Sequence, residues 1–103
     1  MLMSEELLGL YLNCESKRYR DVARNQVLYK GFVRAVNAMK SVGSVEGLRN
    51  ISSLHYERLK HQYAGYSSVR LSNSYVHRLL FIELEDGLKV ELITIDDTHY
   101  GNK

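Results

Sequence analysis

The first half of the chain has apolar residues at helical spacing. Apolar side chains recur at three- and four-residue steps over residues 4–13, where Ser4 suits the N-cap and acidic residues follow it. The same spacing predicts one longer helix over residues 20–40. Gly43 suits a left-handed C-cap for this helix, and Ser44 suits the N-cap of a short turn after it. We therefore expect two helices and a short turn in this half.

The second half changes to the period of a strand. Residues 66–71, 75–84 and 89–95 are rich in Val, Ile, Leu, Tyr and Phe, and polar stretches separate them. Asp86 and Gly87 suit a tight hairpin between the last two segments. Both faces of the middle segment are largely apolar, which is typical of a central strand. We expect a three-stranded antiparallel meander with both helices packed on one side of it.

Length and composition favour one domain. The chain has 103 residues, of which 45% are hydrophobic and 25% charged. The expected fold class is α+β, a single domain over residues 1–103 with N-terminal helices (about 4–49) packed on a small antiparallel β-sheet (about 66–96). The sequence has neither a membrane-length apolar run nor a signal-peptide pattern, so we expect a cytoplasmic protein without a membrane partner. Cys14 is the single cysteine and cannot form an internal disulfide.

The net charge of +2 conceals a segregation of charge along the chain. Residues 17–82 contain twelve of the 14 Lys and Arg residues but three of the 12 acids, so this segment carries +9 and the two ends together −7. Clustered cations gain affinity for a polyanion by releasing its counterions. Two interpretations remain open at this point: a polyanionic partner, or basic residues that solvate exposed helix faces.

An arginine lies inside the middle strand segment. Arg78 stands among Val, Leu and Ile, and an unpaired charge in that setting is costly. It is expected either to pair with Glu83, Glu91 or Asp96, or to contact a phosphate through its guanidinium fork. Arg70 has a similar setting in the preceding strand segment, and two arginines on adjacent strands favour an anion site.

Other groups suited to acid–base chemistry lie near the ends of the expected strands. His55, Lys60 and His61 precede the first strand, and His99 and Tyr100 follow the last. Cleavage of a phosphodiester needs a base, an acid and cations, and these residue types suit those tasks. His55 and His61 are six residues apart with no second pair of metal ligands beside them, and the one cysteine is remote, so we expect no zinc site.

Tyrosines between residues 56 and 75 interleave with basic residues, a mixture that can stack unpaired bases and hold their phosphates. RNA fits this pattern better than duplex DNA, because no basic recognition helix is visible. The expected RNA-binding residues are Arg58, His61, Tyr63 and Tyr66.

Four stretches of the chain resemble the RelE/ParE superfamily of bacterial toxins, and most closely its HigB branch, the plasmid maintenance system killer proteins. The similarity spans residues 6–100, and the order and spacing of the stretches carry it. They are LHYERLK (54–60), AGYSSVRL (64–71), YVHRLLF (75–81) and DDTHY (96–100). The resemblance implies the same α+β fold.

The resemblance also implies an activity and partners. It implies the toxin of a type II toxin–antitoxin system, an mRNA interferase that cleaves messenger RNA in the ribosomal A site without a metal or cofactor. Its partners would be the ribosome, mRNA and an antitoxin of the helix-turn-helix type that binds an exposed sheet edge and helical groove. Two alternatives remain open: a non-enzymatic toxin that inhibits DNA gyrase, as in the ParE branch, and a general RNA-binding domain.

The resemblance assigns the catalytic roles residue by residue. The 2′-hydroxyl attacks the adjacent phosphate and expels the 5′-oxygen of the next nucleotide. Arg70 and Arg78 match the strand arginines that would contact the phosphate. His55 or Lys60 would act as the general base.

The C-terminal stretch would supply the remaining roles. His99 is the candidate general acid. Tyr100 would stack on or orient the nucleobase, and Asp97 would position His99. The sequence departs from the family pattern in three places. Tyr56 stands where proline is usual, and Thr98 and the His-Tyr order alter the usual C-terminal Tyr-His. Residues 1–3 are too few for the strand with which the family normally begins.

Overall fold

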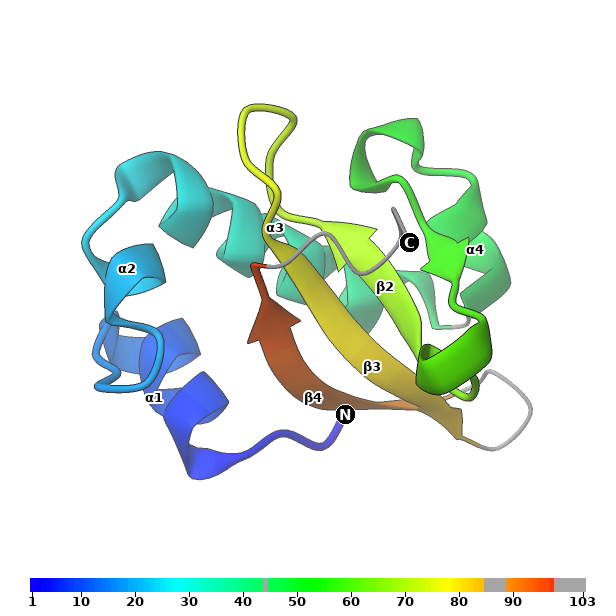
Figure 1. Ribbon diagram of the computed structural model, residues 1–103, viewed down its shortest axis with the longest axis horizontal. Helices are drawn as coiled ribbons and strands as arrows, with labels where there is room; N and C mark the ends of the chain where they lie inside the picture. Colours follow the sequence, from blue (N-terminus) through cyan, green and yellow to red (C-terminus); the bar gives the residue numbers. More distant parts are fainter. Residues whose placement is uncertain (44, 85–88, 98–103) are drawn as a thin grey trace.

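A computed structural model describes residues 1–43, 45–84 and 89–97 (Figure 1). Its α-helices come first in the chain, and the strands that follow form an antiparallel sheet. This confirms the expected α+β class. The helical elements are α1 (Glu5–Asn13), α2 (Arg20–Ala23), α3 (Gln26–Val42), α4 (Val45–Arg49), and the 3-10 turns η1 (Ser52–Leu54) and η2 (His61–Tyr63). The strands are β1 (Glu57–Arg58), β2 (Ser67–Arg70), β3 (Arg78–Leu84) and β4 (Lys89–Asp96). Within the described residues, none of the helices has the length and apolar character that crossing a membrane requires.

The first helix has the expected N-terminus. The Ser4 side chain accepts a hydrogen bond from the Leu7 N–H at 3.2 Å, and two acids occupy the first turn. Gly43 is the expected left-handed C-cap of α3, with φ of 73°. Ser44, the expected cap of the next turn, lies outside the described residues.

The single long helix predicted over residues 20–40 is wrong, because the chain breaks between α2 and α3. Asn25 has an extended backbone, with φ of −115° and ψ of 111°, which no helix can continue. Its side chain accepts from the N–H groups of Val27 and Leu28 at 3.0 and 3.2 Å, and so begins α3. The apolar spacing does not show this break, because the apolar positions before and after Asn25 keep nearly the same helical period.

The sheet has the order β1-β2-β3-β4, with every pair antiparallel. β3 is central, as the sequence predicted, but the sheet has four strands because the two-residue β1 pairs with the start of β2. β3 begins at Arg78, three residues later than expected. Leu2 adds one parallel bridge to Glu91 on the β4 edge, where no full first strand was expected. The hairpin expected at Asp86 and Gly87 lies outside the described residues.

The core lies between the helices and one face of the sheet, as expected. In Figure 1, α3 passes behind the sheet. The buried core joins side chains of α1 and α3 to strand residues, including Leu7, Leu10, Phe32, Val36, Val69, Leu79 and Phe81. On the other face, Leu80 packs with Leu59, and Tyr63 and Tyr66 lie against them. We call this face, which carries Arg78 and Leu80, the outer face of the sheet.

Helix α3 approaches the backbone that follows β2 closely at a glycine. A Cβ at Gly31 in α3 would lie 1.9 Å from the backbone oxygen of Leu71 and 2.8 Å from its carbonyl carbon. We expect Gly31→Ala to lower the free energy of unfolding by about 2 kcal/mol or more, although alanine favours a helix, because backbone atoms must move. Urea denaturation measures this change. The control is Lys30→Ala at an exposed neighbouring position; equal stability of both variants would contradict the close contact.

Candidate functional site

Arg78 lies in a set of polar contacts on the outer face of the sheet. Its Nε donates to Ser68 Oγ at 2.7 Å, and its Nη2 donates to the His55 carbonyl oxygen at 2.5 Å. The same Nη2 lies 3.7 Å from Glu57 Oε1, and the Arg78 side chain is 13% exposed. The positive charge is therefore largely removed from water but is paired and hydrogen-bonded. We call His55, Glu57, Ser68 and Arg78 the Arg78 cluster.

Strand pairing brings the Arg78 cluster together. Glu57 on β1 is in register with Ser68 on β2, so the Arg78 side chain reaches across β2 to the edge strand. His55 ends η1 with φ of 49°, a conformation that turns the chain toward β1. Glu57 was not among the three carboxylates expected to pair with Arg78. Sequence reasoning missed it because a two-residue strand has no readable period.

Arg70 lies on the strand adjacent to that of Arg78, as the sequence predicted. The two residues are directly opposite in the register of β2 and β3. Arg70 Nε donates to the Tyr75 carbonyl oxygen at 3.3 Å, which holds its side chain against the loop between the strands. Like charges directly opposite in a sheet repel each other. A bound anion between the two guanidinium groups would offset that repulsion.

Arg70, but not Arg78, lines a cleft of about 220 Å³ between α3 and the loop after β2, together with Gly31, Arg34, Ser53, Asn73 and Ser74 among others. The His55 ring lies near the same loop, with Nε2 3.0 Å from Asn73 Oδ1. Both His55 and Asn73 are exposed. The structure thus brings together three expected catalytic residues, His55, Arg70 and Arg78.

The residues expected to bind RNA lie on one hairpin. β1 and β2 are joined by residues 59–66, which include η2; we call this segment the η2 loop. It is closed by hydrogen bonds from the N–H of Leu59 to the Tyr66 oxygen at 2.9 Å and from the N–H of Tyr63 to the Lys60 oxygen at 3.1 Å. Lys60, His61 and the neighbouring Arg58 are exposed, whereas Tyr63 and Tyr66 are half-buried. His99 and Tyr100 lie outside the described residues, so their relation to this hairpin is not defined.

Sequence reasoning missed a second polar cluster, formed by Tyr56, Ser67 and Glu83. The hydroxyl groups of Tyr56 and Ser67 both donate to Glu83 Oε2. The Arg49 guanidinium lies over the Tyr56 ring, 4.9 Å from its centroid. Tyr56 also packs on Phe81, which places the cluster on the helical side of the sheet. A tyrosine where the resembling family has proline was the one signal in the sequence.

This cluster shifts the pKa of two of its members. Burial raises the pKa of Tyr56, and its hydrogen bond to Glu83 raises it further. Burial alone would also raise the pKa of Glu83. The hydrogen bonds from Ser67 and Tyr56, together with the charges of Arg58 and Arg49, outweigh burial and lower the pKa of Glu83. Glu83 is therefore held as a carboxylate.

No family model matches the chain, and no curated protein matches it either. A proposal for the function of the chain rests on the geometry of the described residues and on the sequence resemblance.

The Glu83 carboxylate should stabilise the fold in a pH-dependent way. Because the pKa of Glu83 is lowered in the folded state, its contribution is present above the ordinary value of 4.5 and is lost as the pH falls through the lowered pKa. We expect Glu83→Gln to reduce the free energy of unfolding by about 1 kcal/mol at pH 7, a modest value because the side chain is half-buried.

Denaturation of wild type and variant at pH 7 and at acid pH measures this contribution. The difference should shrink on the acid side, and the exposed control Glu15→Gln should change little at either pH. A variant as stable as wild type at pH 7 would show that the cluster does not stabilise the fold.

Proposed function

We propose that this chain is the toxin of a type II toxin–antitoxin system and acts as a ribosome-dependent mRNA endonuclease. One observation supports the proposal above the others: Arg70 and Arg78 are adjacent on the outer face, and His55 is tied to Arg78 through its carbonyl oxygen. The resemblance to the RelE/ParE superfamily assigns these same three residues to catalysis. The basic η2 loop continues the same surface.

The two arginines supply the positive charge that phosphate binding needs. Ser68 and Glu57 hold the Arg78 guanidinium in place before any ligand arrives. Fixed positive groups stabilise the negative charge that develops on the phosphorus oxygens in the transition state, and they need no reorganisation during the reaction. Arg70 supplies a second guanidinium, and the guanidinium fork matches two phosphate oxygens.

His55 is the better candidate for the base of the two that the resemblance offers. With Asn73 Oδ1 as acceptor, the Nε2 of His55 carries the hydrogen and Nδ1 is the basic nitrogen. Nδ1 would take the proton of the 2′-hydroxyl, the 2′-oxygen would bond to phosphorus, and the bond to the 5′-oxygen would break. The products are a 2′,3′-cyclic phosphate and a 5′-hydroxyl, with the last proton assigned to His99.

The η2 loop suits the neighbouring nucleotides. Tyr63 and Tyr66 are half-buried against Leu59 and Leu80, which leaves part of each side chain accessible to a base. Lys60 and His61 are exposed in the same loop and offer charge to the phosphates, whereas Arg58 is in register with Ser67 and lies on the Glu83 side of β1. Such a surface binds single-stranded RNA with little sequence preference. In the cytoplasm, the ribosome would determine which part of the messenger reaches the site.

The helical side offers a surface for the antitoxin. Leu8 and Leu12 on α1 are 42% and 63% exposed. They border a cavity of about 630 Å³ whose lining includes Leu2, Met39, Lys40, Lys89 and Val90. Exposed apolar side chains around a cavity favour a protein partner, and β4 with its Leu2 bridge is the adjoining sheet edge.

Substitution of the arginines tests the proposed activity. Arg70→Ala and Arg78→Ala should each reduce messenger cleavage in a reconstituted translation reaction by about 100-fold or more and relieve growth arrest, because the phosphate loses a fixed cation. His99→Ala should also lose activity as the proposed acid. The matched control is Arg24→Ala, at an exposed arginine that ends α2.

Thermal melting of each variant separates lost catalysis from lost folding, and Arg70→Ala is the more informative variant because Arg78 also links strands. Full cleavage by all three variants would contradict the assignment. Inhibition of gyrase supercoiling by the wild-type chain, without messenger cleavage, would support the gyrase-directed alternative instead.

A further inference from the structure

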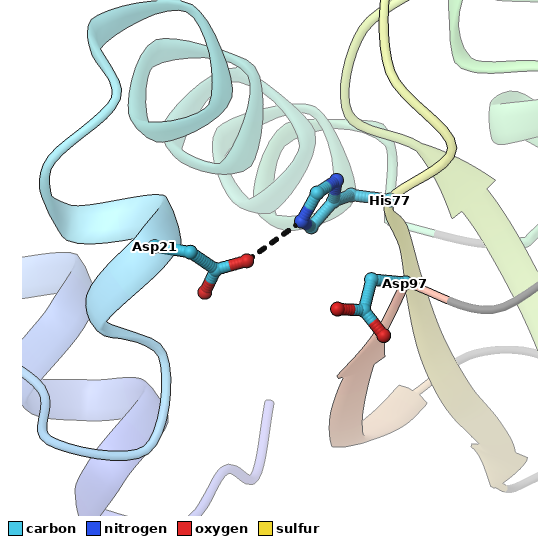
Figure 2. Close-up of side chains that lie close together, drawn as sticks. All are labelled: Asp21, His77 and Asp97. Atoms are coloured by element: carbon cyan, nitrogen blue, oxygen red, sulfur yellow. Dashed lines mark hydrogen bonds and ion pairs between the residues drawn. The ribbon is translucent and has the colours of Figure 1, made fainter.

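Three side chains of types that can bind a metal ion lie close together beside the sheet, away from the Arg78 cluster. Figure 2 shows Asp21 of α2, His77 just before β3 and Asp97 just after β4 directed toward a common space. One ligand atom from each lies within 4.8 Å of the other two. His77 Nε2 is 2.8 Å from Asp21 Oδ2.

Strand register explains why these residues meet. β3 and β4 pair Arg78 with Asp96, so the next residues along, His77 and Asp97, face each other across the two chains. Residues alternate between the faces of a sheet, so His77 points to the side opposite Arg78. α2 lies on that side and contributes Asp21. The convergence therefore follows from the fold. Of its three residues, only Asp97 also has an expected role in the proposed reaction, that of positioning His99.

The imidazole is held in position by its neighbours. The His77 side chain is 13% exposed, whereas that of Asp21 is 56% exposed and Asp97 is also exposed. The Tyr75 ring packs edge-on against the His77 ring, with 6.0 Å between the ring centroids. The Asn25 side-chain amide donates a hydrogen bond to the Tyr75 hydroxyl at 2.9 Å. A fixed ring between two accessible carboxylates is the arrangement in which a cation binds without rebuilding the protein.

We propose that Asp21, His77 and Asp97 bind one divalent cation of the borderline class represented by Zn²⁺. An imidazole nitrogen with two carboxylate oxygens suits Zn²⁺ better than Mg²⁺ or Ca²⁺, which prefer oxygen ligands alone. Three protein ligands leave further coordination positions for water. A cation also offsets the repulsion between the two carboxylates.

The distances fit this proposal after a small closure. Bonds of about 2.0–2.2 Å at tetrahedral angles place two ligand atoms of one Zn²⁺ about 3.3–3.6 Å apart. The outer limit of 4.8 Å in the structure therefore requires at most about 1.2–1.5 Å of movement. Asp21 and Asp97 are exposed, so rotation of their side chains provides that movement.

The histidine also sets the strength of binding. Coordination through Nε2 places the ring hydrogen on Nδ1, and Nδ1 is buried without a hydrogen-bond partner among the described residues. Burying that hydrogen without a partner opposes binding. Together with the two exposed ligands, this cost favours weaker binding than at a site whose ligands are buried and hydrogen-bonded.

Calorimetric titration of the full chain with Zn²⁺, after dialysis against a chelator, tests the site. We expect one ion per chain, with affinity reduced at least tenfold in Asp97→Asn and in Asp21→Asn and by more in His77→Gln. Zn²⁺ should also raise the melting temperature of the wild type, because an ion that links α2 to the sheet binds the folded chain preferentially. Mg²⁺ at the same concentration should do neither.

The matched controls are His61→Gln and Glu15→Gln, which leave the three ligands in place and should bind Zn²⁺ as the wild type does. Asp97→Asn keeps the test valid even if loss of His77 weakens folding, because Asp97 is exposed. The proposal is overturned if the wild type does not bind Zn²⁺, or if Asp97→Asn and Asp21→Asn bind it as tightly as wild type.

Discussion

The burial of one positive charge at the start of the central strand organises much of this small sheet. Arg78 is 13% exposed, and a guanidinium so placed must find acceptors within the protein. Its acceptors are Ser68 on β2 and groups of two short elements, the His55 carbonyl oxygen after the 3-10 turn η1 and Glu57 on the two-residue strand β1. Arg78 thus holds the β1 edge onto β2 through Ser68 and Glu57, and with that edge it fixes the hairpin that carries the η2 loop.

The sheet divides the molecule into two sides with different chemistry. On the helical side, α1 and α3 cover an apolar core, and α3 comes close enough at Gly31 that a side chain there would meet the Leu71 backbone. On the outer face, paired arginines, an exposed histidine and half-buried tyrosines form the surface that we propose binds RNA. The Asp21, His77 and Asp97 group belongs to neither the core nor that surface, and so a cation bound there would act on the packing of α2.

How far the sequence predicts this structure depends on the range of each interaction. Local signals gave the Ser4 and Gly43 caps, and the apolar character of both faces identified β3 as central. The break at Asn25 was missed because a capping side chain does not alter apolar spacing. The sequence predicted Arg70 and Arg78 on adjacent strands, but their direct opposition requires strand register, as does the pairing of Glu57 with Arg78, Tyr56 with Glu83, or His77 with Asp97. Apolar alternation predicts the face on which a residue lies, but register also depends on turn geometry and on the irregularity at Leu80 and Phe81, which the apolar pattern does not show.

The central claim is that the Arg78 cluster and the η2 loop form one RNA-binding surface. The most direct measurement is amide chemical-shift mapping of the isotope-labelled full chain, titrated with a short single-stranded RNA whose 2′-hydroxyls are methylated so that it cannot be cleaved. We expect the shifts to concentrate in residues 55–70 and at Arg78, and to weaken as salt is raised because phosphates are bound. Shifts confined to α1 and α3, or the absence of saturable shifts at low salt, would contradict the account.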